Sequence, residues 1–185
     1  MNFGAIPFSN ITARTGLLQR LAIRGYPTLL MLSPTDHSSG DRTIVNANIR
    51  GIIETGDYLS EFPYNSKLYG DLNHTPMDIN DHKCLIVFHE GGDDTEQNDI
   101  MDAVKRASSC VVPDLQMYWA MTVTSVSKSV REALQLDRVT PDAIVLLLDI
   151  PDCGAYYISQ HDGPVTQDVI VNFVNAPGKR QQMKG

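Results

Sequence analysis

The feature that most limits the fold is the order of apolar segments in the second half of the chain. Two segments are nearly continuous apolar runs, which is typical of strands buried on both faces. Three others carry apolar residues at helical spacing, and one alternates apolar with more polar residues, as a strand with one buried face does. In chain order we expect 83–89 (strand), 95–108 (helix), 115–124 (alternating strand), 125–136 (helix), 143–150 (strand), 155–159 (strand) and 165–175 (helix). This order predicts an α/β domain in which a right-handed βαβ unit is followed by a β-hairpin and a closing helix.

The first part of the chain predicts helix, strand, strand and helix. Asn10 is a candidate N-cap for a helix over 10–23, which a following glycine ends. Residues 28–32 and 43–47 flank a polar loop and predict an antiparallel hairpin, and a helical turn is expected at 56–62.

These patterns predict two domains of unequal size. We expect a partial domain over 1–64, a polar linker over 65–81, a second domain over 82–176 and a flexible tail over 177–185.

Composition narrows the class of partner. The chain has 185 residues and a formal net charge of −7, so it lacks the basic balance that nucleic acid or an anionic membrane would require. No apolar run approaches the roughly 20 residues of a membrane helix, and the N-terminus does not follow the signal-peptide pattern. We therefore expect protein partners, no nucleic acid, no membrane, and a location in the cytosol with the nucleus as a second compartment.

Two short motifs are in register with the predicted order. Residues 25–28 read Gly-Tyr-Pro-Thr at the start of an apolar strand, and residues 61–64 read Glu-Phe-Pro-Tyr ahead of the second domain. With the continuation "CLIVFHEGGDD" at 84–94, the chain resembles the C-terminal half of the nucleoredoxin family and, more distantly, tryparedoxins. The resemblance implies a thioredoxin-like fold: a C-terminal half-domain that lacks its first strand–helix–strand half, followed by one complete thioredoxin-like domain.

The resemblance also implies a function. Nucleoredoxin-like proteins are cytosolic and nuclear protein-disulfide reductases and redox regulators, and the vertebrate member restrains Wnt signalling by binding Dishevelled. By resemblance, Pro27 matches the family's cis-proline, which shapes the wall of the active site, and Tyr26, Pro27 and Thr28 would contact an extended peptide. Tyr26 stands where the family usually has an aliphatic residue.

The reactive dithiol of such proteins is missing from this sequence. In a thioredoxin core it lies at the start of the helix after the first strand, where the helix N-terminus lowers a thiol pKa. Here residues 90–95 read Glu-Gly-Gly-Asp-Asp-Thr, without sulfur. Three cysteines are widely spaced: Cys84 is expected in the core, whereas Cys110 at a helix end and Cys153 in a tight turn are candidate redox-sensitive thiols.

Metal and cofactor chemistry is not indicated either. The acidic residues around 90–99 do not follow the spacing of a calcium loop, and acids in the first turn of a helix complement its dipole. The five histidines are scattered along the chain. We expect no catalytic residue, no metal and no cofactor in this chain.

Two hypotheses of function remain open. The first is a non-catalytic thioredoxin-fold module that binds or regulates another protein. The second is a fragment or isoform of an active protein-disulfide reductase whose Cys-x-x-Cys lies upstream.

The missing half-domain has a consequence for assembly. The strand at 28–32 would normally pair with it, so its edge would be open and apolar, which invites strand addition. The helix face around Leu17 and Leu21 would lose its cover as well. We expect residues 1–62 to be completed by another chain, to dock on the second domain or to be incompletely ordered, with self-association through 28–32 as one route.

Overall fold

The computed structural model divides the chain into two compact units, residues 1–66 and 67–185, and each is described by itself. The structure describes residues 6–7, 9–21, 23, 28–35, 40, 42–46, 49, 53, 67–73, 79–111, 115–136 and 139–183. None of the helices in these ranges is long and apolar enough to cross a membrane.

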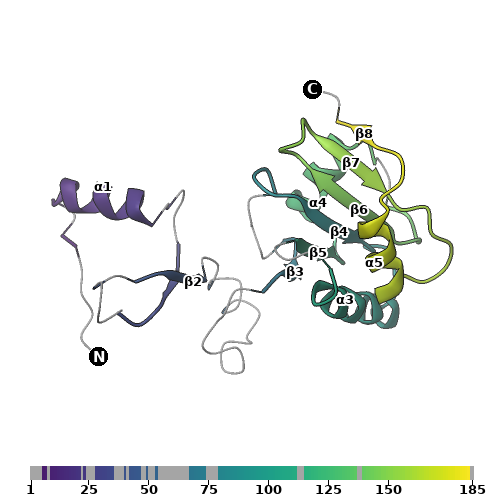
Figure 1. The fold of residues 1–185 in the computed structure, drawn as a ribbon, viewed down its shortest axis with the longest axis horizontal. Helices are drawn as coiled ribbons and strands as arrows, with labels where there is room; N and C mark the ends of the chain where they lie inside the picture. Colours follow the sequence, from purple (N-terminus) through teal and green to yellow (C-terminus); the bar gives the residue numbers. More distant parts are fainter. Residues whose placement is uncertain are drawn as a thin grey trace. The chain divides into compact units, whose positions relative to one another are not determined.

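The first unit contains a helix and a hairpin. Helix α1 (Ile11–Arg20) begins after Asn10, whose side chain accepts a hydrogen bond from the Ala13 backbone N–H at 3.1 Å, as the N-cap prediction requires. Strands β1 (Met31–Leu32) and β2 (Ile44–Asn46) pair antiparallel (Figure 1), which confirms the predicted hairpin with shorter strands. No α1 side chain is buried.

Other predictions for this unit stay open. The helical turn expected at 56–62 lies outside the described residues. That the unit is the second half of a thioredoxin-like domain also stays a prediction, because the described residues supply only one helix and one hairpin of that plan.

The second unit is built on a six-stranded mixed sheet with the strand order β3-β5-β4-β6-β7-β8 (Figure 1). The first three strands in that order run parallel, and each later strand is antiparallel to its neighbour. The strands are β3 (Tyr69–Asp71), β4 (Cys84–Phe88), β5 (Gln116–Ala120), β6 (Ile144–Asp149), β7 (Ala155–Ile158) and β8 (Gln181–Gln182).

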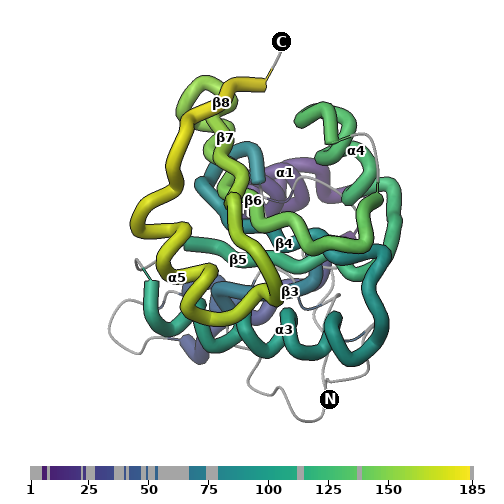
Figure 2. The backbone as a smooth tube through the Cα atoms, turned by 90° about the vertical axis from the view of Figure 1, so that its right-hand side faces the viewer, coloured from purple at the N-terminus to yellow at the C-terminus, as the bar shows by residue number. Residues whose placement is uncertain are grey.

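Helices cover both faces of this sheet (Figure 2). Two apolar cores lie between these helices and the sheet. Helices α3 (Asp94–Ser108) and α5 (Gln167–Asn175) pack against one face, and α4 (Ser125–Ala133) packs against the other. Successive side chains of a strand point to opposite faces, so Val87 of β4 joins the first core and Phe88 the second.

A parallel βαβ unit joined to an antiparallel hairpin, with helices on both faces, is a thioredoxin-like arrangement. The α/β fold predicted from the segment order, and its thioredoxin-like character implied by the resemblance, are therefore confirmed for the second unit.

The predicted linker and the predicted flexible tail each contain a short strand of the sheet, so these two predictions are wrong for the residues of those strands. Tyr69–Asp71, inside the predicted linker at 65–81, form β3, and Gln181–Gln182, inside the predicted flexible tail, form β8. Both segments are too short to show a strand period, and backbone pairing orders them: the Met117 N–H donates to the Leu68 carbonyl oxygen at 2.7 Å, and the Met183 N–H to that of Gly154 at 2.9 Å. The remaining domain limits stay predictions.

The strand at 115–124 differs from its predicted pattern as well. Its supposedly more polar face is buried, with Tyr118 1% and Ala120 0% exposed, because α4 covers that side of the sheet. Burial raises the pKa of the Tyr118 hydroxyl above its usual range.

Truncation in the α3/α5 core should destabilise the second unit strongly. Leu147 is fully buried among residues of the sheet, α3 and α5, so we expect Leu147→Ala to lower the free energy of unfolding by about 2–5 kcal/mol. Urea unfolding followed by fluorescence of the single tryptophan, Trp119 in β5, reports on this unit. Val123→Ala is the matched control, since that side chain is 59% exposed and should change stability by less than about 0.5 kcal/mol. Equal losses for the two variants would contradict the described core.

Candidate functional site

The loop that follows β4 begins the first helix of the thioredoxin-like unit. The His89 N–H extends the sheet pairing by donating to the Ala120 carbonyl oxygen at 3.0 Å. Asp93 then caps α3, because its Oδ1 accepts hydrogen bonds from the backbone N–H groups of Thr95 and Glu96, each at 2.9 Å. Glu96 completes a capping box by accepting from the Asp93 N–H at 3.4 Å. The sequence therefore defines where this helix starts.

Two further residues fix the conformation of this loop. Gln97 Nε2 donates to the carbonyl oxygens of His89 at 3.0 Å and Met121 at 2.9 Å, which ties the loop to the end of β5. Gly92 approaches the imidazole of His89 so closely that a Cβ atom there would overlap the ring. The backbone of His89 is thus held by Gln97, and its imidazole packs directly against Gly92.

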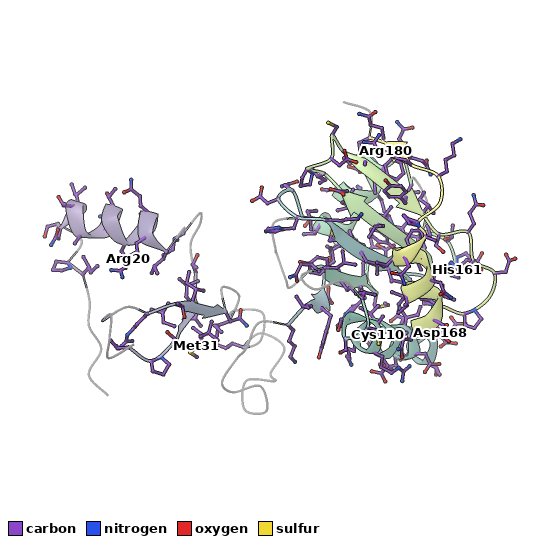
Figure 3. All side chains as sticks on the ribbon, viewed as in Figure 1. Arg20, Met31, Cys110, His161, Asp168 and Arg180 are labelled. Carbon is purple, nitrogen blue, oxygen red and sulfur yellow. The ribbon has the colours of Figure 1, made fainter. Side chains whose placement is uncertain are left out.

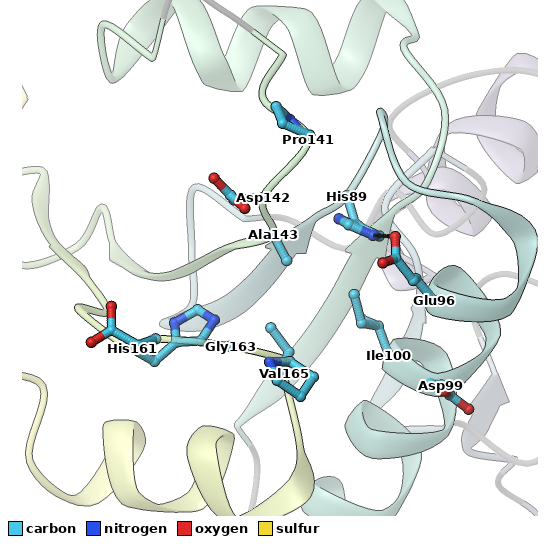
Figure 4. A pocket seen from close by; sticks show the side chains of 12 residues that line it. His89, Glu96, Asp99, Ile100, Pro141, Asp142, Ala143, His161, Gly163 and Val165 are labelled. Carbon is cyan, nitrogen blue, oxygen red and sulfur yellow. Dashed lines mark hydrogen bonds and ion pairs between the residues drawn. The ribbon is translucent and has the colours of Figure 1, made fainter.

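A pocket of about 530 Å³ opens beside the start of α3 (Figure 4). Three segments form it: the start of α3 with His89, the turn that leads into β6, and the loop between β7 and α5. The lining residues are His89, Glu96, Asp99, Ile100, Pro141, Asp142, Ala143, His161, Asp162, Gly163, Pro164 and Val165.

The polar side chains of this pocket are acidic or imidazole groups. Four of the lining residues carry carboxylates: Glu96, Asp99, Asp142 and Asp162. His89 Nε2 lies 3.1 Å from Glu96 Oε2, and His161 Nδ1 lies 3.2 Å from the hydroxyl of Ser159. Within the described ranges no group of three or more potential ligands is placed to hold a metal ion. Acidic groups therefore dominate the polar part of the pocket lining.

Glu90, one residue after His89, forms a buried ion pair with α4. The Arg131 guanidinium donates to Glu90 Oε2 from Nε at 2.7 Å, and its Nη2 lies 2.5 Å from the same oxygen. The two side chains are 7% and 0% exposed, and the guanidinium carbon lies 4.5 Å from the centroid of the Phe88 ring. A carboxylate with a structural partner thus occupies the beginning of the segment where the fold carries its reactive dithiol.

None of the three cysteines is located at that segment. Cys84 lies within β4 and is buried, and this burial, with a smaller contribution from the Asp149 carboxylate, raises the pKa of its thiol to about 12. Cys110 and Cys153 are exposed. Cys110 follows α3, close to the start of α5 (Figure 3), and its sulfur accepts a hydrogen bond from Gln167 Nε2 at 3.2 Å.

Cys153 occupies the turn between β6 and β7 with φ of 54°, a left-handed conformation. Neither exposed cysteine lines the pocket beside α3. Their redox sensitivity stays a prediction.

The peptide-binding residues expected by resemblance belong to the first unit. Tyr26 and Pro27 lie outside the described residues, and Thr28 is described just ahead of β1. Their role stays a prediction.

Sequence reasoning missed two of the three segments that form the pocket. The turn into β6 had a recognisable signal, because Thr140-Pro141 stands shortly before an apolar strand just as Tyr26-Pro27 does before 28–32. The loop at 161–165 carried no periodic signal, since only the antiparallel pairing of β6 and β7 brings it to this end of the sheet.

The fold and this site together define a thioredoxin-like domain whose dithiol position holds a carboxylate-rich helix start in place of sulfur. In sequence, the chain is similar to nucleoredoxin of Mus musculus (19% identical) and of Homo sapiens (20% identical), each over 92% of this chain. It spans only 39% of the length of these curated relatives. No protein-family model matches the chain. This distant similarity supports a relationship with the thioredoxin-like redox proteins.

Breaking the ion pair between Glu90 and Arg131 should destabilise the fold. Arg131→Met leaves a buried carboxylate without its cation, so we expect a loss of about 3–5 kcal/mol in the free energy of unfolding. The double variant Glu90→Gln/Arg131→Met removes both charges and should recover most of that loss. Urea unfolding provides the measurement.

The exposed pair Lys128–Glu132 on the same helix is the control, because Glu132→Gln should cost less than about 0.5 kcal/mol. Additive losses in the double variant would show that Glu90 and Arg131 are not coupled.

The thiols should differ sharply in reactivity. At pH 8 we expect the native chain to react rapidly with Ellman's reagent at Cys110 and Cys153, and at Cys84 only after unfolding in guanidinium chloride, because the attacking species is the thiolate. Cys110→Ser and Cys153→Ser should each remove one rapid equivalent. Rapid reaction of all three thiols in the native protein would contradict the buried position of Cys84.

Proposed function

We propose that this chain is a non-catalytic, thioredoxin-fold module that binds and regulates another protein, and that the pocket beside α3 is its binding site. The observation that carries the proposal is the segment 90–95, which contains no sulfur and begins with the ion-paired Glu90. Thiol–disulfide exchange needs an attacking thiolate and a second sulfur within reach. The fold keeps a pocket at this position without the chemistry of the dithiol.

A second candidate function is that of a fragment or isoform of a protein-disulfide reductase whose Cys-x-x-Cys lies upstream. The observation in its favour is that the chain spans 39% of the length of the nucleoredoxins it matches. In that case the pocket would serve a larger protein as an accessory binding site.

The nature of the partner follows from the resemblance to nucleoredoxins. A Dishevelled-like protein and a role in Wnt signalling, in the cytoplasm and the nucleus, belong to this proposal. Self-association through residues 28–32 is the further interaction that we propose for the first unit, where Leu29 is 46% exposed.

An insulin-reduction assay tests the proposed lack of catalysis. We expect the purified chain to give no precipitation of insulin above the background of dithiothreitol, and no turnover with thioredoxin reductase and NADPH. The reason is that the start of α3 contains no cysteine, so Cys110 and Cys153 have no partner thiol at the position where the exchange reaction takes place in this fold. A thioredoxin with an intact dithiol is the positive control. Turnover that is lost in Cys110→Ser or Cys153→Ser would refute the non-catalytic function.

A further inference from the structure

We infer that the pocket beside α3 binds the cationic side chain of an arginine or lysine presented by a partner protein. This inference rests on the proposed binding function and names the chemistry of the ligand. It follows from the charge of the pocket, from the unused hydrogen-bonding capacity of His89 and from the mixture of polar and apolar groups in the wall.

The charge of the pocket favours a cation. Its lining includes the carboxylates of Glu96, Asp99, Asp142 and Asp162, and no lysine or arginine is among the described residues that form it. Three of these carboxylates, Asp99, Asp142 and Asp162, have no ion-pair partner in the part of the chain that the structure describes. Figure 4 shows the Asp99 side chain directed away from the cavity, so this carboxylate acts only through its longer-range field. Carboxylates gathered around one cavity attract a positive group and disfavour an anionic one.

His89 supplies the second, independent observation. It is only 5% exposed, and its Nδ1 is buried without a hydrogen-bond partner, although an unsatisfied buried polar atom is costly. Figure 4 shows His89 in the pocket wall, with Nε2 directed at Glu96 and the opposite edge of the ring turned towards the segment 141–143. The pocket wall therefore contains an unsatisfied polar atom, which a bound group can reach by a small rotation of the imidazole.

The contact with Glu96 indicates which kind of group that is. A carboxylate only accepts hydrogen bonds, so His89 Nε2 carries the hydrogen in the contact with Glu96 Oε2. In the neutral imidazole, Nδ1 is then an acceptor and requires a donor from the ligand. Guanidinium and ammonium groups are positively charged and only donate, so they match both the carboxylates and this nitrogen.

The size and the apolar part of the wall favour a side chain on a peptide over a bare ion. The cavity of about 530 Å³ is within the range of small-molecule sites, and Ile100, Pro141 and Val165 provide apolar surface for an aliphatic stem. Across the described residues no cluster of three or more metal-ligating side chains is formed, which argues against a coordinated cation.

Peptide titration of the ¹⁵N-labelled full chain, followed by amide chemical shifts, tests this inference. The probe is an acetylated and amidated peptide, Gly-Ala-Arg-Ala-Gly, with matched peptides that carry citrulline or glutamate in place of arginine. We expect the arginine peptide to shift amides of the α3 start and of the segments 141–143 and 161–165. Citrulline has nearly the same shape without the charge, so that peptide should bind at least about fivefold more weakly, and the glutamate peptide should not bind.

Variants locate the site. We expect Asp162→Asn to weaken binding of the arginine peptide by about fivefold, whereas Asp102→Asn makes the same charge change on the outer side of α3 and should leave affinity unchanged. His89→Gln can keep a donor to Glu96 but has no acceptor at the position of Nδ1, because its amide oxygen lies beside the donor nitrogen, and it should weaken binding to a similar extent. The tryptophan unfolding curve of each variant verifies that it is folded.

Three results would overturn the inference: equal affinity for the arginine and glutamate peptides, shifts confined to residues outside the pocket, or equal weakening by Asp102→Asn and Asp162→Asn. Free arginine amide that binds as tightly as the peptide would overturn the assignment to a partner protein and indicate a small-molecule ligand. These failures are distinct from failure of the proposed function, which is measured by insulin reduction. If the chain shows no reductase activity and no preference for the arginine peptide, the proposed non-catalytic function stands and the inference of a basic ligand fails.

Discussion

Complete burial of β4 is the constraint on which the rest of the thioredoxin-like unit depends. All five residues of this strand are buried, with β5 hydrogen-bonded on one side and β6 on the other. Side chains of β4 therefore enter both apolar cores, and each core is closed by its own helices. A strand held in this way fixes the position of whatever follows it. Here that is the loop from His89 to Asp93 and the start of α3.

That loop combines two arrangements of charge that serve different ends. Glu90 is directed away from the pocket into a buried pair with Arg131, which is a structural use of charge. Glu96 and Asp99 instead belong to the pocket wall, where Glu96 is hydrogen-bonded to His89. Acidic residues at the start of a helix also complement its dipole, so Glu96, which lies in the first turn of α3, both helps the helix to form and adds negative charge to the pocket. In a protein that used a thiolate here, this concentration of carboxylates would oppose the reaction.

Local pattern was sufficient to predict the central elements of the second unit but only part of the site. The runs around Cys84–Phe88 and Ile144–Asp149 and the helical spacing of α3 are properties of consecutive residues, so their order could be deduced from the sequence. The edge strands β3 and β8 could not, because two or three residues have no period and depend on a neighbouring strand for order. The pocket joins residues from 89 to 165, and only the pairing of strands reveals that they meet. The absence of sulfur at 90–95 is evident from the sequence alone, whereas the unpartnered Nδ1 of His89 is evident only from the structure.

The short strands at the two ends of the sheet restrict how this unit can associate with other proteins. Strand β3 has three residues and β8 has two, and β8 lies alongside β7, the last of the long strands. Edges this short offer few free amide and carbonyl groups to an incoming polypeptide, which is one way in which proteins avoid edge-to-edge aggregation. Pairing of this sheet with a strand of another protein is thereby disfavoured. Such pairing uses backbone groups and so depends little on the partner's sequence. For a binding module of the kind proposed, selectivity would then depend on the shape and charge of side chains, and a small number of substitutions around one cavity would be enough to change it.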